Sequence, residues 1–159
     1  MKYIWFFIAF ISLNSYGADA SWTKATTHYT IYSNGGYATM PFDPPTTVPK
    51  NGGKITTVSY SVTPYTAKLK YKEAMQETIY MCYAYPYSKE NDKFCQYLDK
   101  TEGSVNAFQN LNPYGSIWIK HTVTVDLSKI DNDKLSEIFP IFADGRTDTV
   151  TVNYQYQKK

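Results

Sequence analysis

The chain has 159 residues, a formal net charge of +2 and an aromatic content of 17%, most of it tyrosine. Of its sixteen basic residues only Arg146 is an arginine, whereas nucleic-acid sites favour arginine for its planar, bidentate guanidinium. This composition argues against nucleic acid as a partner, and no segment after the first twenty residues is apolar enough to span a membrane.

Residues 1–20 have the layout of a secretory signal peptide. Lys2 supplies a positive start, residues 4–13 are apolar, and small residues offer cleavage before Ala18 or before Ser21. The apolar run is shorter than the roughly 20 residues that cross a bilayer. We therefore expect an exported protein, located in the periplasm, on the cell surface or outside the cell. Residues 21–159 are long enough for one β-sandwich domain.

Apolar and polar residues alternate with period two through most of this domain, which indicates strands. Three prolines predict a loop at 42–53, and the sequence Asn-Gly-Gly at 34–36 indicates a hairpin turn. Residues 99–115 are polar and end in a strong turn at 112–115. The predicted strands are residues 27–33, 37–41, 54–63, 66–72, 77–87, 94–98, 116–128 and 148–157.

One segment has helical rather than strand spacing. Leu135, Ile138 and Phe139 predict a short helix near residues 131–139, which Pro140 ends. The many short amphipathic strands predict an all-β fold, an antiparallel immunoglobulin-like β-sandwich with this one helix. A small β-barrel is the alternative.

Cys82 and Cys95 are the two cysteines of the chain. In an exported protein an even number of cysteines indicates disulfide bonding. We therefore expect a structural Cys82–Cys95 bridge, which closes a short loop.

The two histidines, His28 and His121, both fall within predicted strands, and His121 lies on the apolar face of its strand. We interpret His121 as a partly buried histidine that bonds to a neighbour, because no compact His-Glu metal motif accompanies it. The sequence contains no Gly-x-Ser-x-Gly motif and singles out no carboxylate pair. We therefore expect no catalytic residue, no metal and no cofactor, and predict that the protein is not an enzyme.

The C-terminal strand carries a pattern found in a known family. Val150, Val152, Tyr154 and Tyr156 alternate with polar residues, and Gly145 precedes them. With the signal peptide and the length, this pattern resembles subunits of chaperone–usher-type bacterial pili (fimbriae). The resemblance implies an incomplete immunoglobulin-like sandwich that a partner completes by strand addition. It also implies that these four apolar residues contact the partner strand.

The leading hypothesis is therefore a secreted or cell-surface, non-enzymatic interaction protein of bacterial type, such as a fimbrial subunit or a small adhesin. Its partner would be a neighbouring subunit, a chaperone, a host protein or a glycan. The alternatives are a stand-alone carbohydrate- or host-protein-binding module and a secreted effector or inhibitor that binds through residues 42–53. Aromatic residues suited to stacking on a ligand are Trp22, Tyr37, Tyr65, Tyr87, Tyr114 and Trp118.

Overall fold

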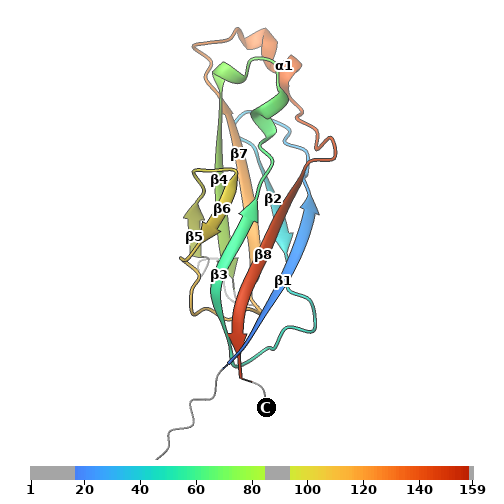
Figure 1. Ribbon diagram of the computed structural model, residues 1–159. Coiled ribbons are helices and arrows are strands. Elements are labelled where there is room, and N and C mark those ends of the chain that lie inside the picture. The colour runs from blue at the N-terminus through green and yellow to red at the C-terminus, as the bar shows by residue number, and fades with distance from the viewer. Residues whose placement is uncertain (1–16, 85–93, 158–159) are drawn as a thin grey trace, which may run out of the picture.

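The computed structural model describes residues 17–84 and 94–157, which form two four-stranded antiparallel sheets packed face to face (Figure 1). The first sheet has the order β1 (Ala18–Thr27), β8 (Thr147–Tyr156), β3 (Gly53–Ser61) and β6 (Glu102–Val105). The second has the order β2 (Tyr37–Phe42), β7 (Ser116–Val125), β4 (Met75–Ala84) and β5 (Phe94–Tyr97). The predicted all-β sandwich is confirmed.

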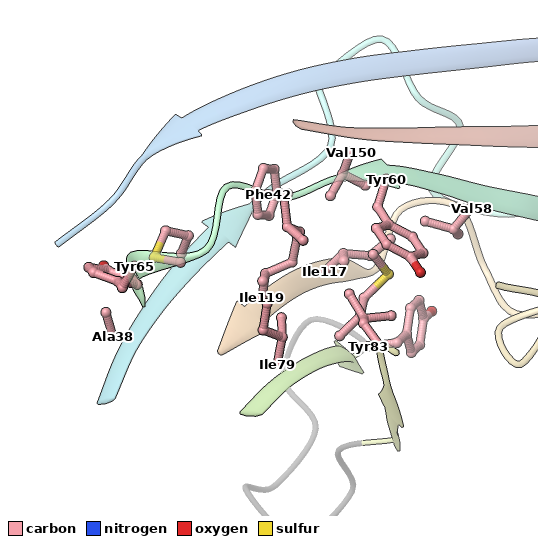
Figure 2. Packing of buried hydrophobic residues seen from close by; sticks show 14 of the residues in the cluster. Ala38, Phe42, Val58, Tyr60, Tyr65, Ile79, Tyr83, Ile117, Ile119 and Val150 are labelled. Atoms are coloured by element: carbon pink, nitrogen blue, oxygen red, sulfur yellow. The ribbon is translucent and has the colours of Figure 1, made fainter. Parts of the chain in front are cut away.

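The core lies between the sheets and follows from the two-residue period of the strands. Ile117, Ile119 and Val123 point inward from β7, and all three are fully buried. Val150 and Val152 of β8 meet them from the opposite sheet and are also fully buried. Figure 2 shows the side chains of both sheets interdigitating. The segments 116–128 and 148–157 were predicted as strands on this alternation.

Short helical segments gather at one end of the sandwich (Figure 1). They are the 3₁₀ helices η1 (Tyr65–Lys68), η2 (Lys72–Ala74) and η4 (Asn132–Lys134), and the α-helix α1 (Leu135–Ile138). The predicted helix is therefore present but shorter than expected, because Phe139 is extended, as residues before proline usually are. None of the described helices has the length and hydropathy needed to cross a membrane.

The prediction of a strand at residues 66–72 is wrong. This segment covers most of η1 and the first residue of η2, and Tyr71 between them has a left-handed backbone with φ of 64°. The carboxylate of Glu77 accepts hydrogen bonds from the backbone N–H groups of Tyr65 and Thr66, each at 3.1 Å. These donors are therefore satisfied by a side chain instead of by a neighbouring strand.

The strand predicted at 27–33 is also wrong, and with it the hairpin to residues 37–41. Within this segment only Ile31 pairs beyond the end of β1, through an isolated bridge to Ile141. β2 pairs with β7, and the N-terminal strand is β1, which pairs along its full length with β8. β6, which pairs with β3, lies in the region expected to consist of turns.

The expected signal peptide lies mainly at residues 1–16, outside the described residues. Ala18, Asp19 and Ala20 are the first three residues of β1 and pair with residues 154–156 of β8. Cleavage before Ala18 would keep these three pairs, whereas cleavage before Ser21 would remove them.

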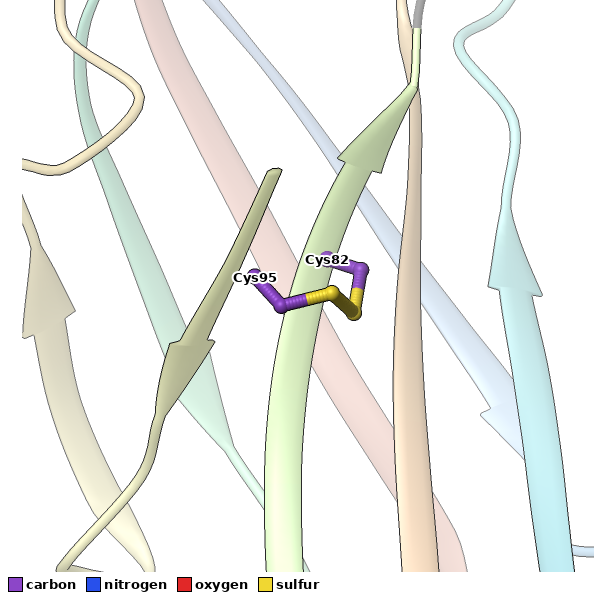
Figure 3. Close-up of a disulfide and its surroundings, with 2 residues drawn as sticks. All are labelled: Cys82 and Cys95. Carbon is purple, nitrogen blue, oxygen red and sulfur yellow. A yellow bond between two sulfur atoms is a disulfide. The ribbon is translucent and has the colours of Figure 1, made fainter. Parts of the chain in front are cut away.

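The expected disulfide is confirmed. Cys82 of β4 and Cys95 of β5 are directly opposite in the ladder, with their Cα atoms 4.0 Å apart (Figure 3). The bond ties the four-residue edge strand β5 to β4. It therefore holds in place a strand that contributes few backbone hydrogen bonds of its own.

Replacing both cysteines by alanine is expected to lower the free energy of unfolding by about 3 kcal/mol, because the bridge closes a loop of 13 residues in the unfolded chain. Urea unfolding of the Cys82→Ala/Cys95→Ala variant against the oxidised parent measures this loss. A difference below about 1 kcal/mol would show that the bridge does not restrict the unfolded chain as this model requires.

Candidate functional site

Four ionisable side chains meet between the sheets, close to η1. Glu77 comes from β4 and His121 from β7, so both belong to the second sheet, while Asp148 comes from β8 in the first. His28 directly follows β1. The relative exposures of His28, His121 and Asp148 are 3%, 0% and 0%. We call these four residues the histidine–carboxylate network, and it links the two sheets through polar contacts.

His121 lies between the two carboxylates. Its Nδ1 is 2.6 Å from Oε1 of Glu77, and its Nε2 is 2.9 Å from Oδ2 of Asp148. The other oxygen of Asp148, Oδ1, is 2.7 Å from Nε2 of His28 and accepts the backbone N–H of Thr63 at 3.0 Å. Asp148 therefore bridges the two imidazole rings.

The contacts of His121 with two carboxylates favour its protonated form. Ionised carboxylates accept hydrogen bonds and donate none, so both ring nitrogens of His121 must donate, which requires the imidazolium. Burial alone would lower the pKa of His121, but the hydrogen bonds and charges of Asp148 and Glu77 outweigh it and raise the pKa. Burial would raise the pKa of each carboxyl, yet contact with His121 leaves both pKa values lowered.

The burial of the network determines what it can do. A general acid or base must come within hydrogen-bond reach of the group whose proton it transfers. Tyr65, which packs against both imidazole rings, is itself fully buried and donates its hydroxyl to the backbone oxygen of Tyr29. The network is thus enclosed in the core, and a ligand in solution cannot approach it in this conformation.

A second candidate site lies on the outer surface of the second sheet. Because side chains alternate along a strand, Tyr80 points outward from β4 between the inward Ile79 and Met81. Tyr80 pairs with Lys120 of β7 on one side and with Tyr97 of β5 on the other. We call the outward tyrosines and tryptophan of this sheet, together with Lys120, the aromatic face, which comprises Tyr37, Tyr80, Tyr97, Trp118 and Lys120.

The rings of the aromatic face are accessible and held by their neighbours. Tyr37, Tyr80 and Tyr97 are 62%, 40% and 49% exposed, and Trp118 is partly exposed. Tyr80 and Tyr97 pack edge to face, with ring centroids 5.6 Å apart. The ammonium of Lys120 lies over the ring of Tyr37, 4.3 Å from its centroid. This face combines exposed apolar area with a positive charge.

A groove of about 240 Å³ adjoins the aromatic face at Tyr97, at the edge where β5 and β6 bring the two sheets together. Most of its lining is polar. The residues that line it are Tyr60, Gln96, Tyr97, Asp99, Ser104, Val105, Asn106 and Ala107. Amide, carboxyl and hydroxyl groups beside an exposed tyrosine ring provide both stacking and hydrogen bonding to a ligand.

The aromatic residues that were predicted to stack on a ligand differ in where they lie, some on the surface and some in the core. Tyr37 and Trp118 belong to the aromatic face, whereas Trp22 and Tyr65 are 5% and 0% exposed and pack in the core. For these two the structure corrects the expectation, because a buried ring presents no surface to a ligand. Tyr114 is partly buried against the core. Tyr87 lies outside the described residues.

The C-terminal strand is also placed differently from the pilus-subunit expectation. β8 pairs with β1 on one side and β3 on the other, so neither of its edges is open. The side chains of Val150, Val152 and Tyr154 are buried in the core of this chain, and that of Tyr156 packs against the core. The position that a partner strand would take beside β8 is filled by the chain's own β1.

Sequence reasoning identified His121 as polar on an apolar face but missed Glu77 and Asp148. Glu77 and Asp148 are also polar residues on apolar strand faces, because Glu77 shares a face with Ile79 and Asp148 shares one with Val150. Tyr80 and Tyr97 were missed as surface residues, although the alternation of residues 77–87 places Tyr80 opposite the apolar face.

No protein-family model matches this chain, and no curated protein matches it. Among solved structures, it is similar to a crystal structure of FLHE, with 16% identity and a TM-score of 0.52, covering 87% of this chain and 98% of that one. A family 11 carbohydrate-binding module of the cellulosomal cellulase Lic26A-Cel5E of Clostridium thermocellum aligns with 10% identity, a TM-score of 0.26 and coverage of 93% and 91%. At these identities the likeness to FLHE concerns the fold alone.

Proposed function

We propose that this chain is an exported, non-enzymatic interaction protein of bacterial type, and that it binds a carbohydrate on the aromatic face. The observation that carries the proposal is the alignment of Tyr80 and Tyr97 in one cross-strand row, both well exposed on a sheet. The disulfide fits an exported protein, because such bonds persist in oxidising compartments.

The chemistry of the surface supports a carbohydrate as the ligand. Sugar rings have apolar C–H faces that pack on tyrosine, and hydroxyl groups that need polar partners. Tyr97 provides the ring, while Gln96, Asp99 and Asn106 line the adjoining groove. A ligand that lies on Tyr97 and extends into the groove therefore meets both kinds of group.

Binding of the purified protein to a glycan array, followed by titration of the best ligand, tests this function. The Tyr80→Ala/Tyr97→Ala variant is expected to weaken binding at least tenfold, roughly the effect of removing a central aromatic contact. Tyr29→Ala/Tyr32→Ala is the matched control, because these tyrosines are more exposed than Tyr80 and Tyr97, at 55% and 77%, but lie outside the aromatic face. The control should bind as the parent does.

Two results would contradict the proposal. Unchanged glycan affinity in the Tyr80→Ala/Tyr97→Ala variant would place the ligand elsewhere on the molecule. The absence of any glycan ligand, together with a protein partner captured through the same face, would replace carbohydrate by protein as the ligand class.

The C-terminal strand resembles that of pilus subunits, but a role as a pilus subunit would require the first sheet to rearrange. A donated strand could add beside β8 only if β1 left it, because β1 and β8 pair over ten residues. Expression of the chain alone in a bacterial periplasm distinguishes the two roles. A stable, protease-resistant monomer would reject assembly by strand exchange, whereas an unstable chain rescued by a partner would support it.

A further inference from the structure

Lys120 is the one charged residue that points outward from the described strands of the second sheet. Its cross-strand neighbours are Thr39 on β2 and Tyr80 on β4. The other outward positions on β2, β7, β4 and β5 hold tyrosine, tryptophan, threonine, serine, glutamine, alanine, proline and the two disulfide-bonded cysteines. A single positive charge therefore stands on a face that is otherwise uncharged.

The charge of Lys120 has no opposite charge within the protein to pair with. Among the residues that the structure describes, no carboxylate lies within ion-pair distance of its ammonium. The ammonium instead lies over the ring of Tyr37, 4.3 Å from the ring centroid. This contact orients the ammonium but leaves its charge uncompensated, because the ring carries no net negative charge. Tyr37 is 62% exposed, so a ligand can reach the pair.

We propose that the carbohydrate bound on the aromatic face is acidic, and that its carboxylate pairs with Lys120. This inference rests on the proposed function, since it specifies the kind of sugar that the same face binds. A lysine ammonium is a point charge, which suits one carboxylate, whereas phosphate recognition favours arginine. The single arginine of the chain, Arg146, is directed at the carbonyl of Phe142 and at Asp144. Uronic acids, which carry one carboxylate on the sugar ring, are the matching class.

The order of the strands gives such a ligand a direction. Lys120 on β7, Tyr80 on β4 and Tyr97 on β5 form one cross-strand row. Neighbouring strands are about 4.8 Å apart, so the row spans about 10 Å, comparable to two linked sugar rings. Asp99 lines the groove beyond Tyr97, where a second carboxylate would be repelled. The acidic ring therefore lies at Lys120, and uncharged rings lie on the tyrosines and toward the groove.

Oligomers of galacturonate, glucuronate and mannuronate, each beside its carboxyl-reduced counterpart, test the proposal. Reduction of the carboxyl group to a primary alcohol removes the charge and keeps the sugar rings and their linkages. We expect the purified protein to bind at least one of these acids about tenfold more tightly than its reduced counterpart, the usual effect of a hydrogen bond to a charged group. Added salt should narrow the difference, because the Lys120–Tyr37 pair is open to solvent.

Substitutions of Lys120 show whether this residue carries the preference. Lys120→Gln removes the charge and should lower affinity for the acid about tenfold, while affinity for the reduced counterpart changes less than about twofold. Lys120→Arg keeps the charge and should keep the preference. Lys24→Gln is the matched control, because Lys24 is an exposed lysine of β1 in the other sheet and its replacement changes the net charge equally. This control should bind both members of each pair as the parent does.

Equal binding of every acid and its reduced counterpart would overturn the acidic ligand. If that binding still depended on Tyr80 and Tyr97, the proposed function would stand. A preference for the acid that survives Lys120→Gln would also overturn the inference, because the carboxylate would then bind elsewhere. Binding of neutral glycans alone would overturn the inference and leave carbohydrate binding intact, whereas binding of no glycan at all would reject both.

Discussion

Asp148→Ala is expected to lower the free energy of unfolding by about 3–5 kcal/mol. The substitution removes the acceptor of three donors, Nε2 of His28, Nε2 of His121 and the backbone N–H of Thr63. It also leaves the His121 imidazolium with Glu77 as its one carboxylate partner in the network. Urea unfolding of the variant and the parent measures the difference.

The matched control is Asp133→Ala, an acidic residue in η4 whose side chain is 73% exposed. Its effect should stay within about 0.5 kcal/mol, as for most surface substitutions. Asp148→Asn is expected to lose most of the stability lost by Asp148→Ala, because it keeps the volume but replaces one acceptor oxygen by a donor. A loss below about 1 kcal/mol in Asp148→Ala would mean that the freed donors find other partners.

The residues of the histidine–carboxylate network can be found from the sequence, but their contacts with one another cannot. Glu77, His121 and Asp148 are each a polar exception on an otherwise apolar strand face, which can be read from alternation alone. Which exceptions meet depends on β8 lying opposite β7 and β4, and that follows from the order of strands in both sheets. A single sequence does not contain that order.

For the aromatic face, too, alternation predicts the face of each strand but not which residues become neighbours. Alternation predicts the side of its strand on which Tyr80 lies, but its neighbours depend on register. The disulfide between Cys82 and Cys95 places Tyr97 opposite Tyr80, two residues along the ladder. The bridge was predicted from the cysteine count, so the row of tyrosines could have been expected once both strands were taken as antiparallel neighbours.

The prediction of a strand at residues 66–72 failed for a different reason. Its alternation of Ala67, Leu69 and Tyr71 with lysines is typical of an edge strand, yet Glu77 satisfies the backbone donors at the start of the segment. A carboxylate eleven or twelve residues away thus decides the local conformation. Local propensity is a weak guide where such tertiary contacts exist.

Trp22→Ala is expected to lower the free energy of unfolding by about 3–5 kcal/mol, the usual range for removing a buried tryptophan. Trp22 is the one buried residue of β1, at 5% exposure, and its indole N–H donates to the carbonyl of Pro113 at 3.4 Å. Its loss leaves β1 attached to β8 mainly through the backbone ladder. Urea unfolding measures the global effect, and amide hydrogen exchange should show reduced protection in β1.

Tyr37→Ala is the control that separates packing from ligand binding, because the two residues were both predicted to stack on a ligand. Tyr37 is 62% exposed, so its removal should change stability by no more than about 0.5 kcal/mol. If Trp22→Ala instead left unfolding unchanged and weakened ligand binding, Trp22 would be a surface contact and the packing of β1 described here would be wrong. Lost stability with unchanged affinity for a ligand on the aromatic face is the result that the burial of Trp22 requires.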